Sequence, residues 1–182
     1  MRELSLNILD IVQNSISAGS PIITIKVHES TPKKSMLIEI LDEGRGMSAE
    51  QVLSVTDPFF TTRTTRKVGM GVPLFKMAAE MTGGSFNINS QLGSGTGVKA
   101  EFYSEHIDMT PLGDINQTVA MLIRMNPNID FVFERSLDEQ SFTLDTRELR
   151  QILEGVPLDT PDVMAWITEF LEENDKELIG GA

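Results

Sequence analysis

Length, composition and charge narrow the kind of protein that this sequence can encode. The chain has 182 residues, no cysteine, two histidines and a formal net charge of −12, which excludes disulfides, thiolate metal sites and a catalytic cysteine and argues against a broad nucleic-acid-binding surface. Because no apolar run is long enough to span a bilayer and the first residues do not resemble a signal peptide, we expect a cytoplasmic protein with no membrane or nucleic-acid partner.

The charges are distributed unevenly along the chain. Residues 1–104 contain 10 Lys and Arg against 10 Asp and Glu, whereas residues 105–182 contain 5 against 17. Such asymmetry favours two parts with different surfaces. It predicts a domain over residues 1–104 and an acidic extension over residues 105–182, although the acidity could serve solubility alone.

Hydrophobic periodicity and turn residues predict the elements in chain order. A helix over residues 4–18 ends at Gly19, and strands over 22–27 and 36–41 form a hairpin. Ser48 and Gln51 have the spacing of a capping box, which predicts a short helix. Residues 56–69 show no period and are rich in threonine and basic residues, as is common in functional lids.

After residue 70 the sequence predicts helices that alternate with pairs of strands. The predicted elements are a helix over 72–82, strands over 85–90 and 98–104, a helix over 113–125, a hairpin of 131–134 and 142–144, a helix beginning at 145, and a last helix from 161 to about 173. Thr160 and Pro161 are typical of an N-cap and a first helical position.

The first helix carries polar side chains among apolar ones. Asn7, Asp10 and Asn14 are spaced i, i+3 and i+7, so they share one helical face. An amide oxygen can bind Mg²⁺, and a carboxylate can orient or deprotonate a water molecule. The alternative is a solvated polar stripe.

Three glycine-containing segments could approach a ligand. Asp42, with Gly44 and Gly46, follows a strand, where a carboxylate could accept a hydrogen bond from an adenine amino group. Gly69 and Gly71 open a helix, whose N-terminus binds anions. The third segment, residues 93–97, contains three glycines and precedes a strand, and its Thr96 offers a hydroxyl at the base of that strand. Each signal alone is also compatible with an ordinary turn or loop.

The order and spacing of these segments resembles the histidine-kinase-like ATPase superfamily (GHKL, Bergerat fold) over about residues 1–104. The resemblance implies an α/β two-layer sandwich, in which a mixed β-sheet has helices on one face, followed here by a small α+β extension. It also implies ATP and Mg²⁺ as cofactors. Within the superfamily, the opening residues 4–10 and residues 111–114 resemble a stand-alone group linked to iron hydrogenase systems of anaerobic bacteria.

The resemblance assigns roles residue by residue. Residues 10–14 match the N box, with Asp10 as the catalytic carboxylate and Asn14 as the Mg²⁺ ligand. Asp42 would bind adenine. The wall of the adenine site and its support would be formed by Gly44, Gly46, Met47 and Thr96.

The phosphate side of the site follows in the same way. Residues 57–63 match the F box and the start of the ATP lid, and Gly69, Met70 and Gly71 would cradle the phosphates. The lid residues expected to contact the nucleotide are Thr61, Thr62 and Arg63.

Two departures from the family pattern bear on activity. Asp10 stands where hydrolysing members usually have Glu, and neither His28 nor His106 lies on a helix that precedes the catalytic domain, as a phosphoacceptor would. We therefore expect Mg²⁺-dependent ATP binding with phosphoryl transfer to a partner protein or slow ATP hydrolysis. The alternative is a non-catalytic nucleotide sensor that regulates a partner by closing its lid.

Overall fold

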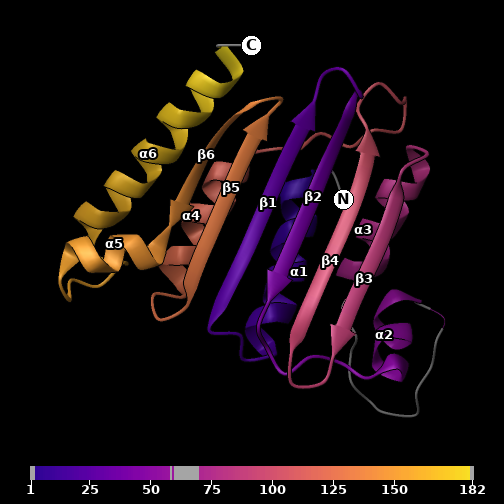
Figure 1. The fold of residues 1–182 in the computed structure, drawn as a ribbon, viewed down its shortest axis with the longest axis horizontal. Coiled ribbons are helices and arrows are strands. Elements are labelled where there is room, and N and C mark those ends of the chain that lie inside the picture. The colour runs from indigo at the N-terminus through magenta and orange to yellow at the C-terminus, as the bar shows by residue number, and fades with distance from the viewer. Residues whose placement is uncertain (1–2, 58, 60–69, 181–182) are drawn as a thin grey trace.

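A six-stranded β-sheet forms the centre of the fold, which this computed structural model describes for residues 3–57, 59 and 70–180 (Figure 1). The strand order is β3-β4-β2-β1-β5-β6, and only the β1–β5 pairing among these neighbours is parallel. The strands are β1 (Ile22–Ser30), β2 (Ser35–Asp42), β3 (Ser85–Gln91), β4 (Gly95–Tyr103), β5 (Asp130–Leu137) and β6 (Gln140–Asp145).

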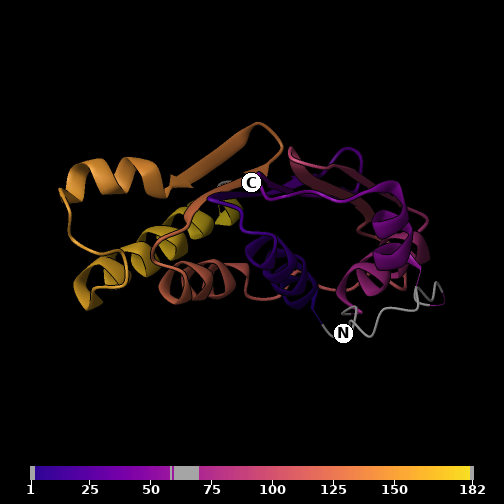
Figure 2. The same cartoon turned by 90° about the horizontal axis from the view of Figure 1, so that it is seen from below.

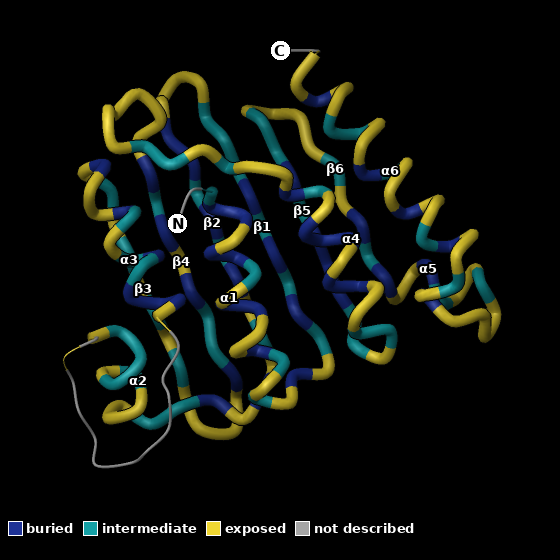
Figure 3. The backbone as a smooth tube through the Cα atoms, turned by 180° about the vertical axis from the view of Figure 1, so that it is seen from behind, coloured by how far each residue is buried: buried dark blue, intermediate teal, exposed yellow. Residues whose placement is uncertain are grey.

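Helices α1, α3 and α4 pack on one face of this sheet, and α6 lies beside α4 on the same side (Figures 2 and 3). The helices are α1 (Leu4–Ser17), α2 (Ala49–Thr56), α3 (Gly71–Met81), α4 (Ile115–Met125), α5 (Thr146–Leu153) and α6 (Pro161–Gly180). No helix in the described ranges is both long enough and apolar enough to cross a membrane.

The alternation of apolar and charged residues along the strands explains this two-layer arrangement. On β1, Ile23, Ile25 and Val27 are buried beneath the helices, while the intervening Lys26 forms an ion pair with Glu134 of β5. Successive strand residues point to opposite faces, so one face is apolar and the other is charged. The predicted two-layer α/β sandwich with a mixed sheet is confirmed.

Aromatic side chains fix α3 on the sheet. The ring of Phe75 lies 5.5 Å from that of Phe102 on β4 and 6.4 Å from that of Phe86 on β3. Such tilted and edge-on pairs add to the stability gained from burial. Phe75 therefore holds the N-terminal end of α3 in a fixed position above β3 and β4.

The last helix is longer than the periodicity predicts. We expected its end near residue 173, but α6 continues to Gly180. Leu171 and Leu178 are both buried, so the apolar stripe resumes after a run of acidic residues. The predicted start is confirmed, since Pro161 is the first helical residue. The Thr160 hydroxyl, predicted as the N-cap, donates to the Pro157 carbonyl instead.

Residues 105–182 add two strands to the sheet formed by residues 1–104. β5 pairs in parallel with β1, with Ile25 opposite Phe133, and β6 continues as a hairpin. The small α+β extension predicted from the sequence is present, and it shares one continuous sheet with the preceding residues.

Candidate functional site

Asp42, the last residue of β2, lies at the centre of the predicted adenine site. Its Oδ1 accepts hydrogen bonds from the backbone N–H of Gly44 at 2.9 Å and of Thr96 at 3.2 Å. Its Oδ2 accepts from the hydroxyl of Ser15 on α1 at 2.6 Å. The carboxylate is thus fixed by donors from a turn, a neighbouring strand and a helix.

These contacts leave the carboxylate with spare capacity. An ionised carboxylate has about four acceptor positions, and the described residues use three of them. The remaining position is on Oδ2, beside the Ser15 hydroxyl. Asp42 can therefore accept one further hydrogen bond from a ligand N–H without losing a partner.

The turn after Asp42 is locked between α1 and the β3–β4 hairpin. Gly46 has a φ of 70°, and a Cβ on it would lie 1.9 Å from the carbonyl oxygen of Gln91. The N–H of Arg45 donates to Ala18 on one side, and its carbonyl accepts from Gly93 on the other. Glycine is needed here because a side chain would displace the hairpin.

Thr96 joins Asp42 to the rest of this wall. It lies opposite Asp42 in the β2–β4 register, and its hydroxyl is 2.8 Å from that of Ser90. The Ser90 hydroxyl in turn accepts from the N–H of Met47 at 2.8 Å. The structure therefore brings Asp42, Gly44, Gly46, Met47 and Thr96 together at one end of the sheet.

The predicted phosphate side of the site is built where α1 crosses α3. A Cβ on Gly71, the first residue of α3, would lie 2.7 Å from the Cβ of Asp10. The N-cap residue, Met70, provides no side-chain cap to the first-turn N–H groups of Gly71 and Val72. A helix N-terminus of this kind attracts anions.

Asp10 and Asn14 lie one turn apart on α1, and both are exposed. Partial desolvation raises the pKa of the Asp10 carboxyl above its ordinary value. Asn7, predicted to share their face, is 2% exposed and belongs to the buried side of α1. The polar face available to a ligand therefore consists of Asp10 and Asn14.

Four predicted site residues fall outside the described part of the chain. Thr61, Thr62, Arg63 and Gly69 are in the segment 60–69, so their assignment as lid and phosphate contacts stays a prediction. Their described neighbour Met70 is half exposed beside Gly71.

Two serines of the site were missed by the sequence analysis. Ser15 is 3% exposed and occupies an inward position of α1 after Ile8, Ile11 and Val12, and Ser90 points inward on β3. A hydroxyl at a core-facing position needs a buried partner. That signal was available for Ser15, but the sequence does not identify Asp42 as its partner.

Comparison with known proteins identifies the family of this chain. The family model described as "Histidine kinase-, DNA gyrase B-, and HSP90-like ATPase" matches residues 2–106. The sensor protein KdpD of Clostridium acetobutylicum is 35% identical over 89 residues, which are 46% of this chain and 10% of the relative. The sensor protein kinase FleS of Pseudomonas aeruginosa is 36% identical over 58 residues, 32% of this chain and 14% of the relative.

The fold has a counterpart among solved structures. The N-terminal domain of a DNA repair protein aligns with a TM-score of 0.55 and 11% sequence identity over 80% of this chain and 53% of its own length. The chain spans less than a fifth of the length of the curated relatives named above. The family match, which covers more than half of the chain, shows that it belongs to the histidine kinase-, DNA gyrase B- and HSP90-like ATPases, a family of ATP-binding proteins.

Proposed function

We propose that this chain binds ATP together with Mg²⁺ between α1, α3 and the ends of β2 and β4, and that it hydrolyses the nucleotide slowly or transfers its γ-phosphoryl group to a partner protein. The observation that carries the proposal is the Asp42 carboxylate, which three donors fix and which keeps one acceptor position free. The adenine amino group supplies the donor that this position requires.

The residues present fit a metal that arrives with the nucleotide. The described residues contain no group of three or more His, Cys, Asp or Glu side chains that could hold a metal alone. Mg²⁺ usually keeps several waters and binds through one or two protein oxygens and substrate phosphates. The exposed Asn14 amide offers one such oxygen, and the bound ion would neutralise phosphate charge.

The chemistry that we assign to Asp10 follows from its surroundings. Its raised pKa makes the carboxylate a stronger base than an ordinary Asp. It lies against Gly71, the first residue of α3, and a helix N-terminus favours phosphate. Asp10 would hold the attacking water, or the hydroxyl or imidazole of an acceptor, and take up its proton.

Nucleotide selectivity tests the role of Asp42. Guanine has a carbonyl oxygen where adenine has the amino group, so the wild-type protein should bind ATP more tightly than GTP. In Asp42→Asn the amide oxygen can still accept from Gly44 and Thr96, and the Ser15 hydroxyl can accept from the new NH₂. The variant should fold but lose about 1–3 kcal/mol of ATP binding.

Calorimetry with ATP and GTP, with and without EDTA, measures this difference. Glu39→Gln is the matched control, because Glu39 lies on the same strand and pairs with Lys99 on the opposite, charged face. The ATP-to-GTP preference should shrink in Asp42→Asn and stay unchanged in Glu39→Gln. An Asp42→Asn protein with wild-type affinity for ATP would refute the adenine assignment.

Phosphate release and protein labelling with γ-labelled ATP separate the possible reactions. Asp10→Asn should keep nucleotide binding and lose both hydrolysis and labelling of added lysate proteins. Binding without any turnover in the wild-type protein would favour a nucleotide sensor instead. Unchanged turnover in Asp10→Asn would exclude Asp10 as the base.

A further inference from the structure

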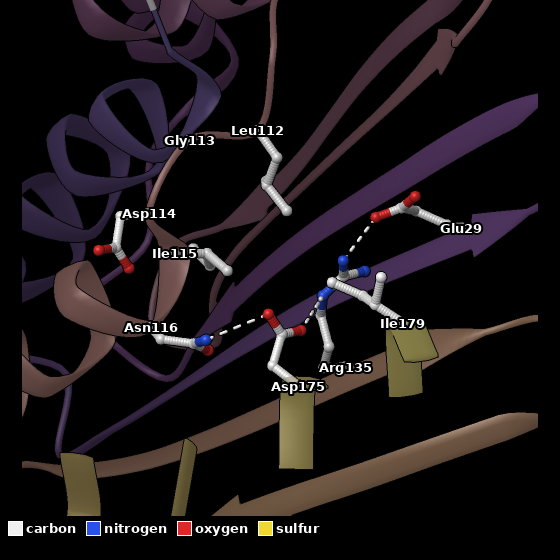
Figure 4. A pocket seen from close by; sticks show the side chains of 9 residues that line it. All are labelled: Glu29, Leu112, Gly113, Asp114, Ile115, Asn116, Arg135, Asp175 and Ile179. Atoms are coloured by element: carbon white, nitrogen blue, oxygen red, sulfur yellow. Dashed lines mark hydrogen bonds and ion pairs between the residues drawn. The ribbon is translucent and has the colours of Figure 1, made fainter. Parts of the chain in front are cut away.

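A cavity lies at the other end of the sheet from Asp42. It has a volume of about 440 Å³, is open to solvent, and is lined by residues of β1, β5, the start of α4 with the segment before it, and the C-terminal half of α6 (Figure 4). Asp42 pairs with Ile23 at the start of β1, whereas the cavity residue Glu29 is six positions further along. At about 3.3 Å per residue, the two sites are about 20 Å apart.

Arg135 of β5 is the central polar group of this cavity. It is 3% exposed, and Figure 4 shows its guanidinium between two carboxylates. Nη2 donates to Glu29 of β1, and Nε lies 3.4 Å from Oδ1 of Asp175 on α6. A buried charge is costly unless its donors are all paired.

The pairing around Arg135 is incomplete. Asn116 of α4 donates through Nδ2 to Oδ2 of Asp175 at 3.2 Å. Among the described residues, four buried atoms lack a hydrogen bond: Nη1 of Arg135 and Oδ1 of Asn116, and also Nε of Arg135 and Oδ1 of Asp175, which face each other only in the 3.4 Å ion pair. Two are donors and two are acceptors, and all belong to side chains that line the same cavity.

The charges around the cavity discriminate between ligand classes. Glu29 and Asp175 form ion pairs with the guanidinium of Arg135, and Asp114, the N-cap of α4, also lines the cavity, so the lining has three carboxylates and one cation. A simple anion would be repelled by the carboxylates, and a simple amine would leave the Arg135 donors unpaired. A ligand with both an anionic and a cationic group satisfies both sets of unpaired atoms.

The remaining lining favours an apolar body on that ligand. Leu112, Ile115 and Ile179 form the apolar part of the wall. Ile179 is 56% exposed, so a ligand that enters from solvent can contact its side chain. The volume lies within the range of about 300–1,000 Å³ that is typical of small-molecule sites with a few placed polar groups.

We propose that this cavity, formed by Arg135, Asn116 and Asp175 with the apolar wall, binds a small zwitterion, a free α-amino acid with an apolar side chain. The carboxylate of the ligand pairs with Arg135, its ammonium group donates to Oδ1 of Asp175 and Oδ1 of Asn116, and its side chain contacts Ile115 and Ile179. The site is separate from the proposed nucleotide site and does not depend on it.

Methyl NMR of the full chain tests the proposal directly. The probes are L-leucine, L-methionine and L-phenylalanine at up to millimolar concentration. At least one of them should shift the Ile115 and Ile179 methyl signals saturably. The methyl signal of Ile152, which is 77% exposed on α5 and outside the cavity, should not move. No saturable shift with any of the three would overturn the proposal.

Matched analogues of leucine test whether both charged groups of the ligand contribute to binding. Isoamylamine lacks the carboxylate and isocaproate lacks the amino group, and each should bind about tenfold more weakly or worse, as expected for loss of hydrogen bonds to charged groups. Equal binding of isocaproate would identify an anion site, and equal binding of all three would identify an apolar pocket. Either result contradicts a zwitterion site.

Variants on α4 locate the binding. Asn116→Ala removes one unpaired acceptor and should weaken the amino acid about twofold to tenfold. Gln117→Ala is the matched control, because Gln117 is exposed at the next position and does not line the cavity. On β5, Arg135→Lys keeps the positive charge but loses the planar guanidinium with its several donors. This variant should bind the amino acid more weakly still. Unchanged affinity in folded Asn116→Ala would refute the placement.

Discussion

The close approach of α1 and α3 makes Gly71→Ala a sharp test of the geometry beside Asp10. The new Cβ would lie 2.7 Å from the Cβ of Asp10, whereas two carbon atoms pack best at about 3.5–4.0 Å. One helix would therefore have to move by roughly 1 Å. The buried side chains of Val12 and Phe75 resist that movement.

The expected magnitude combines a cost and a gain. Overpacking of this kind costs about 1–3 kcal/mol, and replacing glycine by alanine in a helix returns up to about 1 kcal/mol. The net loss of unfolding free energy should be about 1–2 kcal/mol. For a chain of this length that corresponds to a Tm lower by roughly 2–8 °C.

Calorimetric or circular-dichroism melting measures the effect, and two variants control for it. Gly180→Ala changes a helical glycine with nothing within 4 Å of the new Cβ, so its Tm should stay the same or rise slightly. In an Asp10→Gly background the clashing atom is absent, and Gly71→Ala should then be neutral or stabilising.

Two results would refute the reasoning. An unchanged Tm for Gly71→Ala would mean that α1 and α3 do not approach as closely as described. An equal loss of stability with and without Asp10→Gly would mean that the cost does not come from the Asp10 contact. The expected coupling between the two positions is about 1 kcal/mol or more.

Two further predictions concern Asp10 and Thr146. Because desolvation raises the pKa of Asp10, the folded protein binds this proton more tightly than the unfolded chain does, so ionised Asp10 lowers stability at neutral pH. Asp10→Asn should therefore be more stable than wild type in urea unfolding at neutral pH, and the difference should shrink on acidification and vanish below about pH 3, where Asp10 is protonated in both states; a constant difference would contradict this. Thr146 is fully buried. Its hydroxyl accepts a hydrogen bond from the N–H of Phe131 at 2.8 Å and donates one to Asp130 at 3.0 Å. Thr146→Val should therefore lower the free energy of unfolding by about 1–3 kcal/mol. Thr143→Val, at an exposed position of β6, should be close to neutral, and equal effects of the two changes would exclude the buried hydrogen bonds as the cause.

Local patterns predicted the parts of the fold that have local causes. The spacing of Ile8, Ile11 and Val12 indicated α1, and the glycines after Asp42 indicated a turn that could approach a ligand. The helix and the turn are observed, and Gly71 begins α3 as the sequence indicated. Each of these features depends on residues within about one helical turn or one hairpin.

Long-range pairing was not predictable in the same way. The parallel register of β1 and β5, with Ile25 opposite Phe133, joins residues more than a hundred positions apart and has no turn to mark it. The full length of α6 was hidden because acidic residues interrupt the stripe between Leu171 and Leu178. The buried pairing of Arg135 with Glu29 and Asp175 likewise depends on three separate elements.

One edge of β1 is covered only by β5 among the described residues. The family match ends at residue 106, before β5, yet β1 from Ile22 to Glu29 pairs with β5 along its length. In a fragment truncated there, β1 would be an edge strand with a row of open backbone N–H and C=O groups. Its run of β-branched residues would then favour pairing between molecules and aggregation. By pairing with β1, β5 covers the edge through which such a fragment would associate.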